Sequence, residues 1–82
     1  MADVPKPGAH VWTLVNAGHR YDCELRFQAE SSEWECRLLE DGELRYAWRF
    51  TRRASAEIEA EMQRWFLVRE GWTRPVASPS GE

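Results

Sequence analysis

Three segments of the chain alternate between apolar and charged residues, and this pattern constrains the fold more than any other feature. In residues 21–27 Tyr, Cys, Leu and Phe are separated by Asp, Glu and Arg, and residues 34–38 and 44–50 repeat the alternation. A period of two is typical of a strand with one face buried and the other in water. A weaker pattern predicts an earlier strand over roughly residues 11–15.

The loops between these segments predict how the strands pair. With residues 29–32 as the second loop, Phe27 opposes Trp34 and Leu25 opposes Cys36, so apolar residues meet on one face. The same register sets opposite charges against each other on the outer face. It also places the two cysteines on one face, diagonal to each other.

The other two hairpins need a choice of turn. In the first, a two-residue turn at residues 17–18 directs Trp12 and Leu14 inward, whereas a three-residue loop would direct their neighbours inward. We expect the two-residue turn, because an indole buries more apolar area. In the third hairpin a two-residue turn would mix the faces, so we expect a three-residue loop at residues 40–42, with Trp34 opposite Trp48 and Cys36 opposite Tyr46.

After Phe50 the apolar period changes to that of a helix, expected over about residues 52–70. Thr51 is the expected N-cap and Gly71 the expected left-handed residue after the helix, with Trp72 packing on Leu67. The stripe expected to face the sheet consists of Ala54, Ile58, Met62, Trp65, Phe66 and Arg69.

These patterns predict an α+β fold, in which a four-stranded antiparallel meander has one C-terminal helix packed on one face. We expect a single domain over residues 10–72, because the 82-residue chain is short. Residues 1–9 and 73–82 are rich in Pro, Gly and Ser and lack apolar periodicity, so disordered tails are expected there.

The charge and the chain ends bound the possible functions. The net charge is −3 with both signs interleaved, which argues against a dominant attraction to nucleic acid or anionic membranes. The first residues lack the apolar run of a signal peptide and no segment is long and apolar enough to span a bilayer, so we expect a cytoplasmic protein with no membrane partner. Cys23 and Cys36 are then expected to be buried free thiols.

No motif for catalysis, a cofactor or a metal stands out. His10 and His19 lack ligand-type spacing to each other and to the cysteines, so we expect no metal site. No Ser or Cys has a recognisable base, and the carboxylates are spread over outward positions. The sequence therefore predicts a protein that is not an enzyme and that uses no cofactor.

A basic group is the first candidate site. Arg45, Arg49, Arg52 and Arg53 run from the last strand into the start of the helix. Two arginines at a helix N-terminus oppose the helix dipole, and such a locally unfavourable choice can mark an anion or nucleic-acid site. Arg53 has Glu57 one turn further on, which favours an ordinary ion pair instead.

A protein interface is the second candidate. Four strands form a sheet wider than one helix, so part of the apolar face should stay uncovered. The exposed strip would be Trp12 and Leu14 on one edge strand, or Tyr46 and Trp48 on the other. Exposed aromatic surface commonly marks an interface, and a weak homodimer is its simplest use.

The sequence also carries two resemblances. The run GELRYAWRFTRRASAEIEAE, followed by GW, resembles short bacterial proteins of unknown function. Residues 33–66, three strands and a TxxxA-type helix start, are similar to the arm-type DNA-binding domains of phage-like integrases, which implies a sheet face that enters a groove. The chain departs from that pattern because acidic residues, among them Glu33 and Glu35, would repel phosphates.

Together these observations predict a small non-enzymatic protein-interaction module, with an unknown protein partner or a second copy of the chain. The alternative is a nucleic-acid-binding domain that uses the sheet face and the four arginines.

Overall fold

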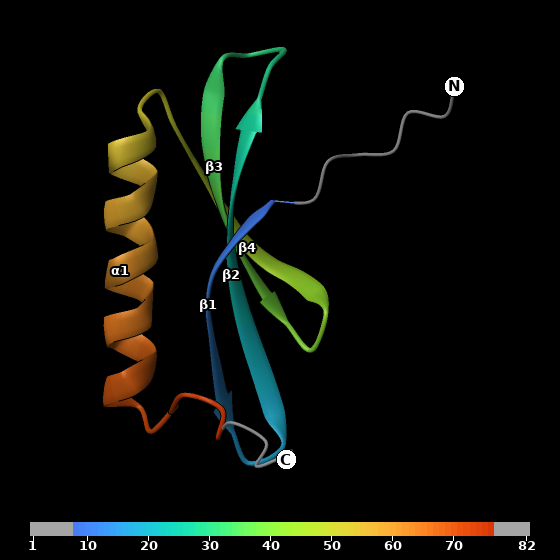
Figure 1. The fold of residues 1–82 in the computed structure, drawn as a ribbon, viewed down its shortest axis with the longest axis vertical. Coiled ribbons are helices and arrows are strands. Elements are labelled where there is room, and N and C mark those ends of the chain that lie inside the picture. The colour runs from blue at the N-terminus through green and yellow to red at the C-terminus, as the bar shows by residue number, and fades with distance from the viewer. Residues whose placement is uncertain (1–7, 77–82) are drawn as a thin grey trace.

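The computed structural model describes residues 8–76, which form four strands and one helix. The strands are β1 (Ala9–Asn16), β2 (His19–Gln28), β3 (Glu33–Glu40) and β4 (Glu43–Phe50), and the helix is α1 (Arg53–Arg69). The strands pair in the order β1-β2-β3-β4, all antiparallel. Figure 1 shows α1 alone on one face of this strongly twisted sheet. The predicted α+β meander with a C-terminal helix is confirmed.

The expected tails lie largely outside the described residues. At the inner ends of these segments Ala9 already belongs to β1, and Thr73 forms a bridge with Val15. The Val15 N–H donates to the Thr73 carbonyl at 2.7 Å, and the Thr73 N–H donates to the Val15 carbonyl at 2.9 Å. Ordered structure therefore continues one residue beyond each end of the predicted domain.

The first two hairpins have the predicted registers. Ala17 and Gly18 both have positive φ, 51° and 83°, as a two-residue turn of the type I′ kind requires. This turn directs Trp12 and Leu14 toward the core. In the second hairpin Phe27 lies opposite Trp34 and Leu25 opposite Cys36, as predicted.

The predicted register of the third hairpin is wrong. Asp41 and Gly42 form a two-residue turn with φ of 52° and 86°, and Cys36 pairs with Trp48 rather than with Tyr46. A bulge prevents the mixing of faces that this turn would cause. Leu39 pairs with Leu44 and Leu38 pairs with Tyr46, so the backbone of Arg45 has no register partner on β3. The aromatic residues of β4 consequently stay on the side of α1.

Residues from the inner strands and the helix form the core. Its buried members are Cys23, Leu25, Cys36, Leu38, Ala56 and Ala60, and half-buried aromatic residues pack around them. These aromatic residues are Trp12, Tyr21, Trp34, Trp48 and Phe50, all of which come from the sheet. The sheet therefore supplies the bulk of the core, and the helix supplies small residues.

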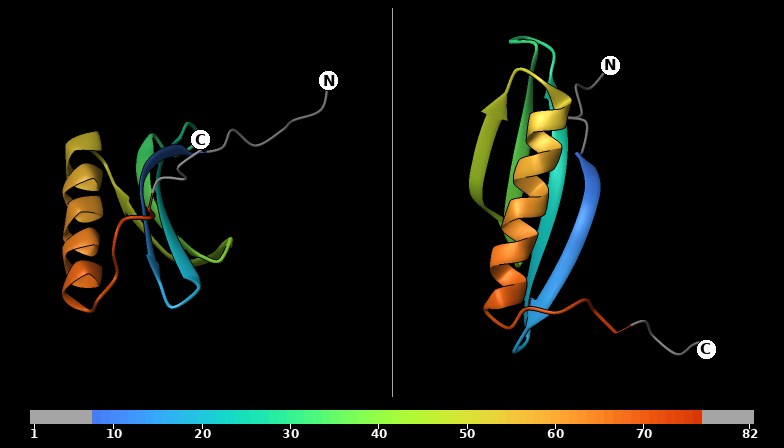
Figure 2. Two further views of the ribbon diagram at one scale, coloured as in Figure 1. Left: turned by 60° about the horizontal axis from the view of Figure 1, so that its bottom comes forward. Right: turned by 90° about the vertical axis from the view of Figure 1, so that its left-hand side faces the viewer.

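The predicted facing of α1 is wrong for this reason. Ala56 and Ala60 are 0% and 1% exposed, whereas Ile58 and Trp65 of the predicted inward stripe are 62% and 60% exposed. Because three indoles rise from the sheet, only a helix face of small side chains can approach closely. The Trp12 Nε1–H donates to the Ala60 carbonyl at 2.9 Å, which fixes this contact. The views in Figure 2 show α1 lying along the sheet with β4 to one side.

The two ends of α1 differ in how well the sequence predicts them. The N-cap is Arg52, with extended backbone and no side-chain cap, so the prediction of Thr51 is wrong by one residue. The backbone of the C-terminal end is as predicted: Gly71 has φ of 102°, its N–H bonds to the Val68 carbonyl, and the Trp72 N–H bonds to the Leu67 carbonyl at 3.0 Å. The Trp72 ring packs edge-on against Tyr21, with centroids 4.9 Å apart.

Candidate functional site

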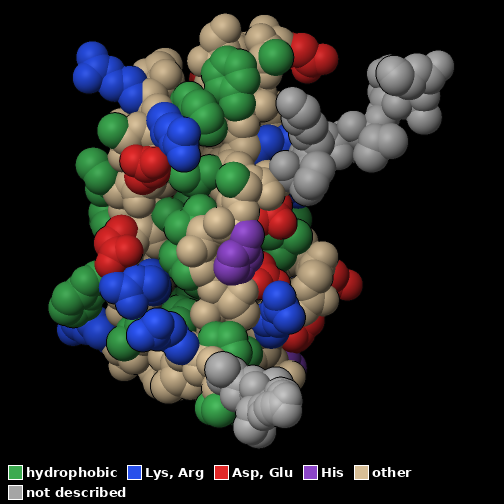
Figure 3. Space-filling model, viewed as in Figure 1, with side chains coloured by type: hydrophobic (Ala, Val, Ile, Leu, Met, Phe, Trp, Pro, Cys, Tyr) green, Lys and Arg blue, Asp and Glu red, His purple; other side chains and the backbone are tan. Residues whose placement is uncertain are grey.

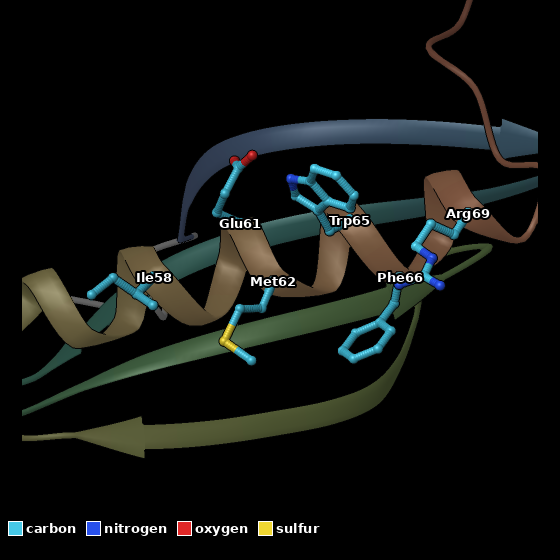
Figure 4. A pocket seen from close by; sticks show the side chains of 6 residues that line it. All are labelled: Ile58, Glu61, Met62, Trp65, Phe66 and Arg69. Atoms are coloured by element: carbon cyan, nitrogen blue, oxygen red, sulfur yellow. The ribbon is translucent and has the colours of Figure 1, made fainter.

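Four large apolar side chains form a continuous exposed stripe on α1, which we call the outer apolar face. Their exposed fractions are 62% for Ile58, 47% for Met62, 60% for Trp65 and 56% for Phe66. These residues line a shallow groove with Glu61 and Arg69. Figure 4 shows Met62 and Phe66 directed toward the β4 side and Trp65 with Glu61 directed toward the β1 side. In Figure 3 hydrophobic side chains follow the outer edge of α1, interspersed with charged ones.

Charged residues border the outer apolar face. The Arg64 guanidinium donates to the Glu61 carboxylate, with Nη2 to Oε2 at 2.6 Å. This hydrogen bond lowers the pKa of Glu61 and raises that of Arg64, so both stay charged over the physiological range. Arg69 lies at the C-terminal end of the groove, where a cation suits the helix dipole. Such a charged border around an apolar centre is typical of protein interfaces.

The two alternatives for an uncovered sheet edge have different outcomes. On β1, Leu14 is 1% exposed and Trp12 is held against α1, so these two residues are not free for a partner, which corrects that alternative. On β4, Tyr46 is 55% exposed and stacks on the half-buried Trp48, with centroids 5.8 Å apart. Tyr46 is therefore partly uncovered, and Phe66 of α1 points toward β4, the strand that carries this aromatic pair (Figure 4).

The four arginines of the predicted anion site do not form one surface. Arg45 pairs with Glu40 at 3.1 Å, and the Glu40 carboxylate also accepts a hydrogen bond from the inward-facing Tyr21, whereas Arg49 pairs with Glu35 on the sheet face that points away from α1. Arg53 pairs with Glu57 at 3.0 Å and lies over the Trp34 ring at 5.3 Å. Within residues 8–76, Arg52 has no ion pair.

The outer sheet face is a network of opposite charges. Glu35, 8% exposed, accepts a hydrogen bond from Arg49 at 3.4 Å and one from Gln28 at 3.2 Å. Arg37 lies 3.7 Å from Glu35 and 3.9 Å from Glu24. Arg37 and Arg49 are therefore compensated by carboxylates of the same chain.

Among the described residues, one group of potential metal ligands lies close together, at the adjacent turns of the first and third hairpins. It consists of His19, Glu40 and Asp41. The His19 Nδ1 bonds to Asp41 at 2.8 Å, the Arg20 N–H donates to Asp41 at 2.9 Å, and Glu40 accepts from Arg45. The hydrogen bond to Asp41 raises the pKa of His19 and lowers that of Asp41. Because His19, Asp41 and Glu40 each already form a hydrogen bond within the chain, we interpret the group as a hydrogen-bonded link between the two turns.

The two cysteines lie within the core. Their Sγ atoms are 3.8 Å apart on adjacent strands, diagonal to each other as the register predicts, and both are free thiols. The hydrogen bond to Cys36, together with burial, raises the pKa of Cys23. The same hydrogen bond lowers the pKa of Cys36, and both side chains are fully buried and pack within the core.

Comparison of the chain with protein-family models, curated proteins and solved structures finds no match. Within residues 8–76, no helix combines the length and the apolar character needed to cross a membrane.

Sequence reasoning places the outer apolar face in the core and so misses it as a site. The signal that could reveal it is the pair Ala56 and Ala60, one helical turn apart, on a chain whose strands already direct large aromatic residues inward. Two small residues at this spacing mark the helix face that approaches closest.

Proposed function

We propose that this domain is a non-enzymatic protein-interaction module whose docking surface is the outer apolar face of α1. The observation that carries the proposal is the exposure of Ile58, Met62, Trp65 and Phe66, four large apolar side chains next to each other on one helix. A contiguous exposed apolar patch of this kind commonly marks a binding site.

The packing of α1 supports this assignment. Ala56 and Ala60 are the members of the buried core cluster that α1 supplies, and none of the four large residues belongs to that cluster. Complete burial of a large apolar side chain contributes about 1.5–3 kcal/mol, and these four, which are about half exposed, forgo a part of it. A partner that covers the face would recover part of this free energy, and Trp65 is the residue type most often dominant in interfaces.

The alternative function, nucleic-acid binding, has weaker support. Its four arginines lie on different surfaces, and Arg45, Arg49 and Arg53 are paired with carboxylates. Phosphate binding would require these pairs to break or to be shared. The proposed setting is the cytoplasm, where the buried thiols Cys23 and Cys36 would stay reduced.

Site-specific crosslinking in cells of the source organism tests the proposal. A photoreactive amino acid replaces Trp65 in one variant and Leu44 in a control variant. Leu44 is a suitable control because it is apolar and 50% exposed but lies at the β3–β4 turn. We expect a discrete crosslinked protein from position 65 and none from position 44. The absence of any crosslink at position 65, or equal crosslinking from both positions, would contradict the proposal.

A further inference from the structure

We propose that the partner of the outer apolar face is a second copy of this chain, bound by antiparallel packing of α1 on α1 about a two-fold axis beside Met62. This inference rests on the proposed function, because it uses the same surface, and it specifies the partner and its register.

The geometry of α1 defines the contact face. Successive residues turn by about 100° around a helix, so Ile58, Trp65 and Arg69 point almost directly away from the buried Ala56 and Ala60. A second helix can therefore lie along α1 without contacting the sheet. The outer apolar face spans residues 58–66, a length of about 12 Å near the middle of the 17-residue helix.

A two-fold axis beside Met62 brings apolar residues together along this length. In an antiparallel pair, residues equally distant from the axis lie level, so Met62 meets its own copy and Ile58 meets Phe66 of the second copy. Trp65 lies within one residue of Ile58 of the second copy. All four members of the outer apolar face are thus covered by one another.

The charged residues next to the outer apolar face are also complementary between the two copies of an antiparallel pair. Glu61 and Arg64 lie on the same flank of α1, and in an antiparallel two-fold pair each flank meets the same flank of the other copy. Measured along the helix axis, Glu61 and Arg64 of the second copy then differ in level by only about 1.5 Å. Symmetry repeats the contact, so the four groups form two intermolecular ion pairs.

This self-complementarity is the argument for a second copy over another occupant. A two-fold contact requires that the surface match its own rotated image, a condition that a surface for an unrelated protein need not meet. A parallel arrangement would instead bring the Glu61 flank toward the flank that carries Glu59, placing like charges side by side.

Mixing two charge-reversed variants tests the register. Glu61→Arg and Arg64→Glu each place like charges across the contact, so each alone should dimerise about tenfold more weakly than the natural chain. In an equal mixture, position 61 of one variant meets position 64 of the other with opposite charges. Sedimentation equilibrium should then show recovered association, although no pairing within either chain has changed.

The ion pair of Arg53 and Glu57 provides the matched control. It lies on the same flank, but in the proposed register Arg53 is about 20 Å along the axis from Glu57 of the second copy, which exceeds the Debye length. An equal mixture of Arg53→Glu and Glu57→Arg should therefore associate no better than either variant alone. Recovery in this control as strong as in the test pair would overturn the register.

A second variant keeps the proposal testable if a charge reversal disturbs folding. Met62→Cys should form an interchain disulfide when copper–phenanthroline and dissolved oxygen accept the electrons and protons of the two thiols, whereas Leu44→Cys should not. A natural chain that stays monomeric to millimolar concentration, or equal disulfide yields, would overturn the inference. A crosslink from position 65 to a different protein, with no doubled mass, would also overturn it but would support the proposed interaction function.

Discussion

Ala56 and Ala60 decide how α1 lies on the sheet, although neither has a side chain of any size. Their exposed fractions of 0% and 1% reflect contact with the indoles of the sheet, and the bond from Trp12 to the Ala60 carbonyl leaves little room for a larger residue. Periodicity in the sequence identifies the apolar stripe of α1 correctly. It cannot show which element supplies the bulk of the core, because that depends on long-range packing.

This packing predicts effects of very different size for two substitutions two residues apart on the helix. Ala60→Leu should lower the free energy of unfolding by about 1–3 kcal/mol, since the added isopropyl group meets the packed sheet. Ile58→Ala should change it by less than about 0.5 kcal/mol, because Ile58 is exposed. Chemical denaturation of the dilute protein measures both. A larger loss of stability for Ile58→Ala than for Ala60→Leu would show that the outer apolar face belongs to the core.

The hairpins show how far local sequence predicts a whole element. Alternation and turn residues predict four strands, their order and the registers of the first two hairpins. The third register requires a bulge at Arg45, which places Leu44 opposite the outward-facing Leu39 and Tyr46 opposite the inward-facing Leu38. Alternation alone does not predict this, because it assigns Leu44 and Tyr46 to one face. The same limit applies to the start of α1, where the N-cap is Arg52, one residue later than the predicted Thr51.

The hydrogen bond between His19 and Asp41, which links the turns of the first and third hairpins, should make the free energy of unfolding depend on pH. The pKa of His19 is raised from its ordinary value of 6.5. The contribution of His19 to stability is therefore complete below pH 6.5 and is lost as the pH rises through the higher pKa of the folded state. The pKa of Asp41 is lowered from 3.8, so its contribution is complete above that pH and is lost on acidification. Thermal unfolding should show His19→Gln less stable than the natural chain at pH 5.5 but equal to it at pH 9. A difference that grows toward pH 9 would contradict this assignment.

For the whole molecule, the compensated outer sheet face predicts weak attraction for polyanions. Fluorescence anisotropy with a short DNA duplex should show no saturable binding at physiological salt, and Arg49→Glu should leave the signal unchanged. Saturable binding that weakens with added salt, and that Arg49→Glu abolishes, would favour the nucleic-acid alternative over the interaction module.

The bridge between Val15 and Thr73 occupies part of the β1 edge and leaves β4 as the longer open edge of the sheet. A second chain that added its own β4 in antiparallel fashion about Ala47 would set its Arg49 directly opposite Arg45, and its Arg45 opposite Arg49. Like charges at opposed positions weaken strand pairing, and charged edge strands discourage edge-to-edge aggregation. Arg45 and Arg49, which first suggest a nucleic-acid site, would thus disfavour β-filaments that grow through β4, whereas the proposed contact between two α1 helices is closed and would not polymerise.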